Sequence, residues 1–120
     1  MELLKKGAIE LGVTLSDRQL DQFEIYFHQL TEWNKRANLT AIIEYDAVQV
    51  KHFLDSLTVW LTAKEVLESS ASRPIRVMDV GSGAGLPGLA LKIAFPDIQL
   101  ALVESVAKKT SFMRHVIDTL

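Results

Sequence analysis

The sequence predicts an α/β fold in which an N-terminal helical segment precedes a parallel β–α–β–α unit. Two observations lead to this prediction. Apolar residues recur every three or four positions over most of residues 1–67, as in amphipathic helices. From residue 75 onward, short β-rich runs alternate with helical stretches, an order typical of parallel sheets. The 120 residues suit one domain with a small hydrophobic core.

The first half of the chain is expected to be helical. Residues 1–11 form a short amphipathic stretch that Gly12 can end. Ser16, with Gln19 three positions later, has the spacing of a capping box and predicts the start of a second helix. The helical spacing after this box comes from five apolar residues: Leu20, Phe23, Phe27, Leu30 and Trp33.

Asn38 and Thr40 interrupt the helical pattern, since both residue types favour caps and turns. Helical spacing resumes over residues 47–67. Residues 69–74 are small, polar or proline and read as a linker. We therefore divide the chain into an N-terminal helical segment, residues 1–72, and a βαβα unit, residues 73–120.

In the second segment, strands are expected at residues 75–80 and 98–103, and helices at residues 86–94 and 107–120. Two parallel strands are rarely a complete sheet, because such strands are normally buried within larger sheets. We therefore expect the chain to be the N-terminal portion of a longer, truncated fold. The alternative is self-association of the fragment through an unpaired strand edge.

Composition narrows the possible partners, cellular location and metal sites of the chain. The net charge of -2 is not that of a basic nucleic-acid-binding domain, so RNA binding would need a local basic patch. No run approaches the roughly 18 apolar residues of a membrane span, and no membrane partner is expected. The chain has no cysteine, which fits a cytoplasmic location and excludes thiolate metal sites; no metal is expected.

The glycine-rich stretch at residues 81–88 is the strongest chemical signal. Gly81, Gly83 and Gly85 let the backbone turn sharply and approach a ligand closely. A helix beginning near Leu86 would direct free N–H groups to the same place, and Pro87 suits a first helical turn. Such a loop can bind S-adenosylmethionine, a dinucleotide, or nothing.

Three features favour S-adenosylmethionine over a dinucleotide, although residues 83–88 also match the weak G-x-G-x-x-G pattern. Asp79 precedes the first glycine and can accept from the ammonium of the cofactor. Pro87 removes a backbone donor that a pyrophosphate would use. The loop also carries an extra early glycine. Glu104, at the end of the second strand, can accept both ribose hydroxyls, with Ser105 and Val106 beside the adenine.

Four stretches together resemble a known family. They are residues 33–40 (WNKRANLT), 52–56 (HFLDS), 79–88 (DVGSGAGLPG) and 104–109 (ESVAKK). On these motifs the chain resembles the bacterial 16S rRNA guanine-N7 methyltransferases, the glucose-inhibited division protein B family. The resemblance implies a Rossmann-like S-adenosylmethionine-dependent methyltransferase fold and cofactor contacts by Gly81, Leu86 and residues around Glu104. Family members are longer, so the chain itself is expected to lack a complete active site.

The resemblance implies methylation of guanine N7 in 16S rRNA of the small ribosomal subunit. N7 carries a lone pair and no proton, so the transfer needs positioning and no general base. No catalytic residue is predicted. The alternatives are a methyltransferase acting on a protein or small molecule, and a non-catalytic module that only binds a nucleotide cofactor.

Contacts to RNA phosphates are expected from basic residues, with an ordinary solvated surface as the alternative for each: Lys35, Arg36, Lys51 and Lys109. Lys109 is distinctive because it falls on the apolar arc of its helix. His52 and Asp55 form either a polar cluster facing the ligand or a structural pair. Tyr26 is a candidate for stacking on a base.

Overall fold

The structure is a computed structural model that describes residues 1–69 and 74–120. Its helices are α1 (Glu2–Glu10), α2 (Asp17–Ala37), α3 (Tyr45–Val48), α4 (Asp55–Leu57), α5 (Val59–Ser69), α6 (Gly88–Ala94) and α7 (Ala107–Thr119). A π-helical segment, η1 (Gln49–Leu54), joins α3 to α4, and the strands are β1 (Arg76–Val80) and β2 (Gln99–Val103). None of the described helices combines the length and apolar character that crossing a membrane requires.

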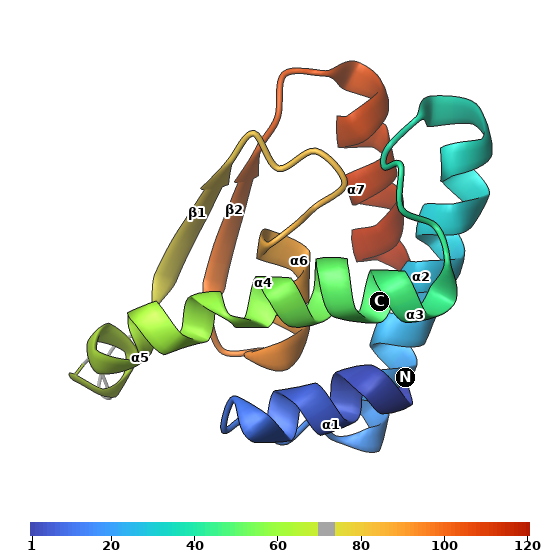
Figure 1. Cartoon of the computed structure of the whole chain (residues 1–120). Helices are drawn as coiled ribbons and strands as arrows, with labels where there is room; N and C mark the ends of the chain where they lie inside the picture. Colours follow the sequence, from blue (N-terminus) through green and yellow to red (C-terminus); the bar gives the residue numbers. More distant parts are fainter. Residues whose placement is uncertain (70–73) are drawn as a thin grey trace.

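The strands confirm the predicted parallel βα arrangement. β1 and β2 pair in parallel, with Arg76 opposite Gln99 and Val80 opposite Val103. Within the described residues, each strand has the other as its one neighbour. The loops that follow both strands therefore emerge at the same edge of the sheet (Figure 1).

One face of this sheet packs against helices and the other is open to solvent. Helix α6 contacts both strands and fills the inner face. On the outer face, Met78 and Val80 are 69% and 73% exposed, and Val103 is 45% exposed. Parallel sheets are normally covered on both faces, whereas the outer face of this sheet exposes apolar side chains to solvent.

A single hydrophobic core joins the two predicted segments. Leu4, Phe23 and Phe53 from the helical half pack in one cluster with Leu89 and Phe112 from the βαβα half. The predicted linker falls mainly on residues 70–73, which lie outside the described residues, so the division at residue 72 stays a prediction.

The predicted capping box at the start of α2 is confirmed. Ser16 Oγ accepts from the Gln19 N–H at 3.1 Å, and Gln19 Oε1 accepts from the Ser16 N–H at 2.8 Å. Gln19 Nε2 also donates to the Ile93 and Ala94 carbonyls at the end of α6. Asn38 ends α2 with φ of 46°, a left-handed conformation that asparagine tolerates.

Two helix predictions need correction. The continuous helix expected at residues 47–67 is instead α3, η1, α4 and α5, with a break at Thr58. Apolar spacing over a single turn cannot distinguish a π-helical turn from an α-helical one, so the pattern concealed the change. Helix α6 begins at Gly88 and not near Leu86. Pro87 is the residue before this start, and the Gly88 N–H donates to the Asp79 side chain, as described below.

Candidate functional site

The loop after β1 is held in a compact turn by its own backbone. The Gly81 N–H donates to the Val103 carbonyl at 2.7 Å, which ties the loop to the end of β2. Ser82 Oγ donates to the Asp79 carbonyl at 2.9 Å, and the Gly85 N–H donates to the Ser82 carbonyl at 2.9 Å. The loop therefore has a defined shape at the edge where both strands end.

The glycines of this loop serve two different purposes. Gly81 and Gly83 have φ of +74° and +57°, and a Cβ added to either would meet nothing within 4 Å. Gly85 has φ of +90°, and its added Cβ would lie 2.5 Å from Leu89 Cδ1 and 2.9 Å from the Tyr26 hydroxyl oxygen. Gly81 and Gly83 thus leave open space that a ligand can enter, whereas Gly85 permits close packing against protein.

Asp79 sits beneath the loop and caps α6. Its Oδ2 accepts from the Gly88 N–H at 2.9 Å. An ionised carboxylate can accept about four hydrogen bonds, so this contact leaves capacity for a further donor. A Cβ on Gly88 would lie 2.8 Å from the same oxygen, which explains why glycine suits position 88. The role predicted for Asp79 toward a cofactor ammonium stays a prediction.

Glu104 connects the loops that follow the two strands. Its Oε1 accepts from the Gly83 N–H at 2.8 Å. Its Oε2 accepts from the Ser105 and Val106 N–H groups at 2.8 and 3.1 Å. These backbone donors, with the nearby charge of Lys109, lower the pKa of the carboxyl group below its ordinary value of 4.5. Glu104 is therefore an ionised acceptor bonded to the backbone of the glycine loop at Gly83.

Tyr26 does not stack on a base, which corrects that prediction. Its side chain is fully buried, and its hydroxyl donates to the Ala84 carbonyl at 2.5 Å. Burial, with a contribution from the Asp79 charge, raises the pKa of the phenol far above its ordinary value. The burial of Tyr26 could have been predicted from its position between Phe23 and Leu30 on the apolar stripe of α2. The hydroxyl contact with the loop had no signal in the sequence.

The basic residues predicted to contact RNA occupy different surroundings. The charge of Lys109 makes a small contribution to the lowered pKa of the Glu104 carboxyl group. Lys35 forms an exposed ion pair with Glu32 at 3.0 Å, and the Arg36 guanidinium lies 6.0 Å from the centre of the Trp33 ring. Lys51 is exposed on η1. Their contacts with RNA stay predictions.

The two upstream motifs pack against each other. His52 Nε2 and Thr40 Oγ1 lie 2.7 Å apart and share a hydrogen bond. The Thr40 N–H donates to Asn34 Oδ1 at 2.8 Å, and Ser56 Oγ donates to the His52 carbonyl at 2.6 Å. Burial lowers the pKa of His52, against a weaker opposing effect of Asp55. These bonds favour the structural interpretation of His52, which anchors the turn after α2.

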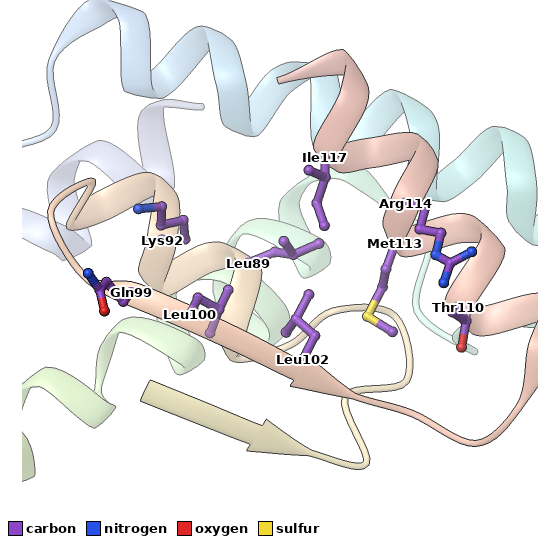
Figure 2. Close-up of a pocket in the computed structure, with 9 residues that line it drawn as sticks. All are labelled: Leu89, Lys92, Gln99, Leu100, Leu102, Thr110, Met113, Arg114 and Ile117. Carbon is purple, nitrogen blue, oxygen red and sulfur yellow. The ribbon is translucent and has the colours of Figure 1, made fainter. Parts of the chain in front are cut away.

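A separate cavity of about 530 Å³ lies between α6, β2 and α7 (Figure 2). Apolar side chains project into it, with Lys92 and Arg114 at its rim: Leu89, Leu100, Leu102, Met113 and Ile117. The Lys92 ammonium donates to the Pro96 and Ile98 carbonyls, so its charge is engaged within the protein. None of the residues of the glycine loop lines this cavity, which is therefore distinct from the candidate site.

Among the side chains described, those of residues 1–65 and 74–120, there is no group of three His, Cys, Asp or Glu able to hold a metal ion. The site instead combines a strand, a glycine-rich loop, a helix and an acidic residue after the next parallel strand. This combination defines the class of α/β proteins that bind nucleoside-containing cofactors at the carboxyl ends of their strands.

Comparison with known proteins specifies the family. The model of the rRNA small subunit methyltransferase G family matches residues 19–120, and the chain belongs to this family. Ribosomal RNA small subunit methyltransferase G of Bacillus thuringiensis (strain Al Hakam) is 46% identical over 111 residues. The proteins of the same name from Bacillus cereus (strain AH820) and Bacillus anthracis (strain CDC 684 / NRRL 3495) match to the same extent. Each alignment covers 92% of this chain and 44% of the relative.

Proposed function

We propose that this chain binds S-adenosylmethionine at the carboxyl ends of β1 and β2, within a Rossmann-like methyltransferase fold. The observation that carries the proposal is the open space beside Gly81 and Gly83, where an added Cβ would meet nothing within 4 Å. Asp79 and Glu104 border the same loop and supply acceptors for an ammonium and a ribose. The residues present therefore fit this cofactor.

Each predicted contact has a distinct chemical task. Asp79 would accept from the ammonium group, and the backbone at Gly81 and Leu86 would lie against the methionine portion. Ser105 and Val106 would border the adenine. Glu104 already accepts three backbone N–H groups, so of its roughly four acceptor positions about one is left. Binding both ribose hydroxyls therefore requires at least one of these N–H groups to move.

We propose that the family's reaction, methylation of guanine N7 in 16S rRNA, is the activity this site serves. The bound cofactor supplies an electrophilic methyl group. N7 would take the methyl group with its own lone pair while the bond between the methyl carbon and the sulfonium sulfur breaks, leaving a neutral thioether. N7 would lose no proton, so the residues of the chain would have to align the two groups and exclude competing geometries. Lys35, Arg36, Lys51 and Lys109 would contact rRNA phosphates, which predicts binding that weakens as salt increases.

Calorimetry with S-adenosylmethionine and NAD tests the cofactor. We expect binding of S-adenosylmethionine, and tighter binding of NAD would reject the proposal. Transfer of labelled methyl groups to small ribosomal subunits tests the substrate, with the Bacillus cereus relative as positive control. Label in a protein instead of 16S rRNA would contradict the substrate. Transfer by the relative alone would restrict the role of this chain to cofactor binding.

We also propose that copies of this chain self-associate through the edge of β1 that lies away from β2. Within the described residues β1 has β2 as its one strand neighbour, and unpaired strand edges tend to recruit another chain. Sedimentation velocity over a range of concentrations tests this. A monomer at all concentrations would contradict it.

A further inference from the structure

We propose that Tyr26 is a positioning residue for the cofactor loop. Its hydroxyl holds the peptide group between Ala84 and Gly85 in one orientation, with the carbonyl directed into the protein. This role rests on the proposed function, because the loop orientation matters for a ligand bound beside Gly83. It gives the N-terminal helical segment a direct part in shaping the cofactor site.

The anchor is rigid. Tyr26 lies in the middle of α2, 58 residues from Ala84 in the sequence, and its side chain is 0% exposed. Its ring lies 5.1 Å from the ring of Phe53 and 6.4 Å from that of Phe112. With η1 on one side and α7 on the other, the phenol cannot follow a loop that moves. The hydroxyl therefore imposes its position on the loop.

The peptide that it holds lies in a segment of the backbone with few steric restraints on rotation. Ala84 lies between two glycines, and glycine adopts positive and negative φ with similar ease. Gly83 and Gly85 have φ of +57° and +90°. A rotation of the peptide would turn the Ala84 carbonyl to where the Gly85 N–H now points, toward the Ser82 carbonyl, and would break the hydrogen bond between Gly85 and Ser82. The loop beside Gly83 would then change shape.

Two hydrogen bonds oppose this rotation. The Gly85 N–H donates to the Ser82 carbonyl at 2.9 Å, and Tyr26 donates to the Ala84 carbonyl at the other end of the same peptide. The first bond is local and moves with the loop. The second comes from outside the loop, so its loss selectively frees the peptide.

The variant Tyr26→Phe removes the hydroxyl while keeping the buried ring, and Tyr45→Phe is the matched control. Tyr45 donates to Glu24 at 2.7 Å, accepts from the Met1 ammonium at 2.6 Å and packs on Phe27. Its variant therefore also loses a hydrogen-bonded hydroxyl, without touching the loop. Amide hydrogen exchange by NMR reports the loop, and calorimetry reports the affinity for S-adenosylmethionine. The exchange rates and the affinities are measured at a temperature at which thermal unfolding curves show each variant to be folded.

We expect Tyr26→Phe to speed exchange at Gly85 and to weaken cofactor binding by about three- to tenfold, the range for one net hydrogen bond. Tyr45→Phe should leave both unchanged. Equal exchange at Gly85 in the two variants would overturn the inference, as would faster exchange with unchanged affinity. If the unmodified chain does not bind S-adenosylmethionine, the proposed function fails. The comparison of exchange still decides whether Tyr26 orients the loop.

Discussion

Alanine substitution should separate the glycine that packs against protein from the glycine that faces a ligand. Gly85→Ala places a Cβ 2.5 Å from Leu89 Cδ1 and 2.9 Å from the Tyr26 hydroxyl oxygen. The Leu89 side chain borders the cavity beside α6 and can shift, whereas Tyr26 is 0% exposed, so the clash with its hydroxyl has little room to relax. Overpacking of this kind costs about 1–3 kcal/mol. The φ of +90° adds a backbone cost of about 1–2 kcal/mol. The free energy of unfolding should therefore fall by about 2–5 kcal/mol.

Gly83→Ala is the matched control, since it changes the same residue type in the same loop. Its φ of +57° lies in the left-handed region, and the new Cβ meets nothing within 4 Å. Only the backbone cost of about 1–2 kcal/mol applies. Its effect on S-adenosylmethionine should be the larger one, because the methyl group enters the space left for the ligand.

Urea denaturation followed by circular dichroism measures the two free energies of unfolding, and calorimetry measures the two affinities. The order of the variants should reverse between the two assays: Gly85→Ala is the less stable, and Gly83→Ala binds the cofactor more weakly at a temperature where both are folded. Equal destabilisation by the two substitutions would refute the division of roles between these glycines.

Three further predictions follow from individual contacts. Gly83→Val should abolish S-adenosylmethionine binding in calorimetry, because a branched side chain fills the open space; retained affinity would mean that the cofactor lies elsewhere. Asp79→Asn keeps an acceptor for the Gly88 N–H but removes the charge, so the thermal midpoint of unfolding should change little. The affinity for S-adenosylmethionine should fall about tenfold, the effect of losing about 1.4 kcal/mol. Unchanged affinity would argue against the ammonium contact. Because folding lowers the pKa of Glu104, its stabilising effect is present above the ordinary value of 4.5 and is lost as pH falls through the lowered folded-state pKa. Denaturation from pH 7 to pH 3 measures the difference in free energy of unfolding between the unmodified chain and Glu104→Gln. This difference should begin to shrink only when the pH falls below 4.5, the ordinary pKa. A difference independent of pH would contradict the ionised contact.

The local features of the fold were predictable because each depends on residues close in sequence. The capping box of Ser16 and Gln19 is one such case, and the cap at Asn38 is another. The strands were predicted within one residue of their observed bounds. Phe112, Met113 and Val116 are buried on α7, as the apolar arc of that helix requires. These features follow from hydrophobic periodicity and from backbone preferences, and both can be recognised from residues that are close together in the sequence.

The start of α6 and the π-helical turn were not predictable in the same way. Gly88, the first residue of α6, donates to Asp79 nine residues away. Gln49, in η1, is 1% exposed and accepts from the Leu4 N–H, 45 residues away. Neither partner can be identified from spacing along the chain.

The candidate site also has features that were predictable from the local sequence and features that depend on contacts between distant residues. A glycine loop after a strand, an acidic residue at the end of the next strand and the family motifs are all visible in the amino-acid sequence. The tertiary structure is needed to show that Gly83 faces open space while Gly85 faces Tyr26, because the direction of a missing Cβ depends on the backbone conformation. It also decided that α2 anchors the loop, since burial brings together groups that are 58 residues apart.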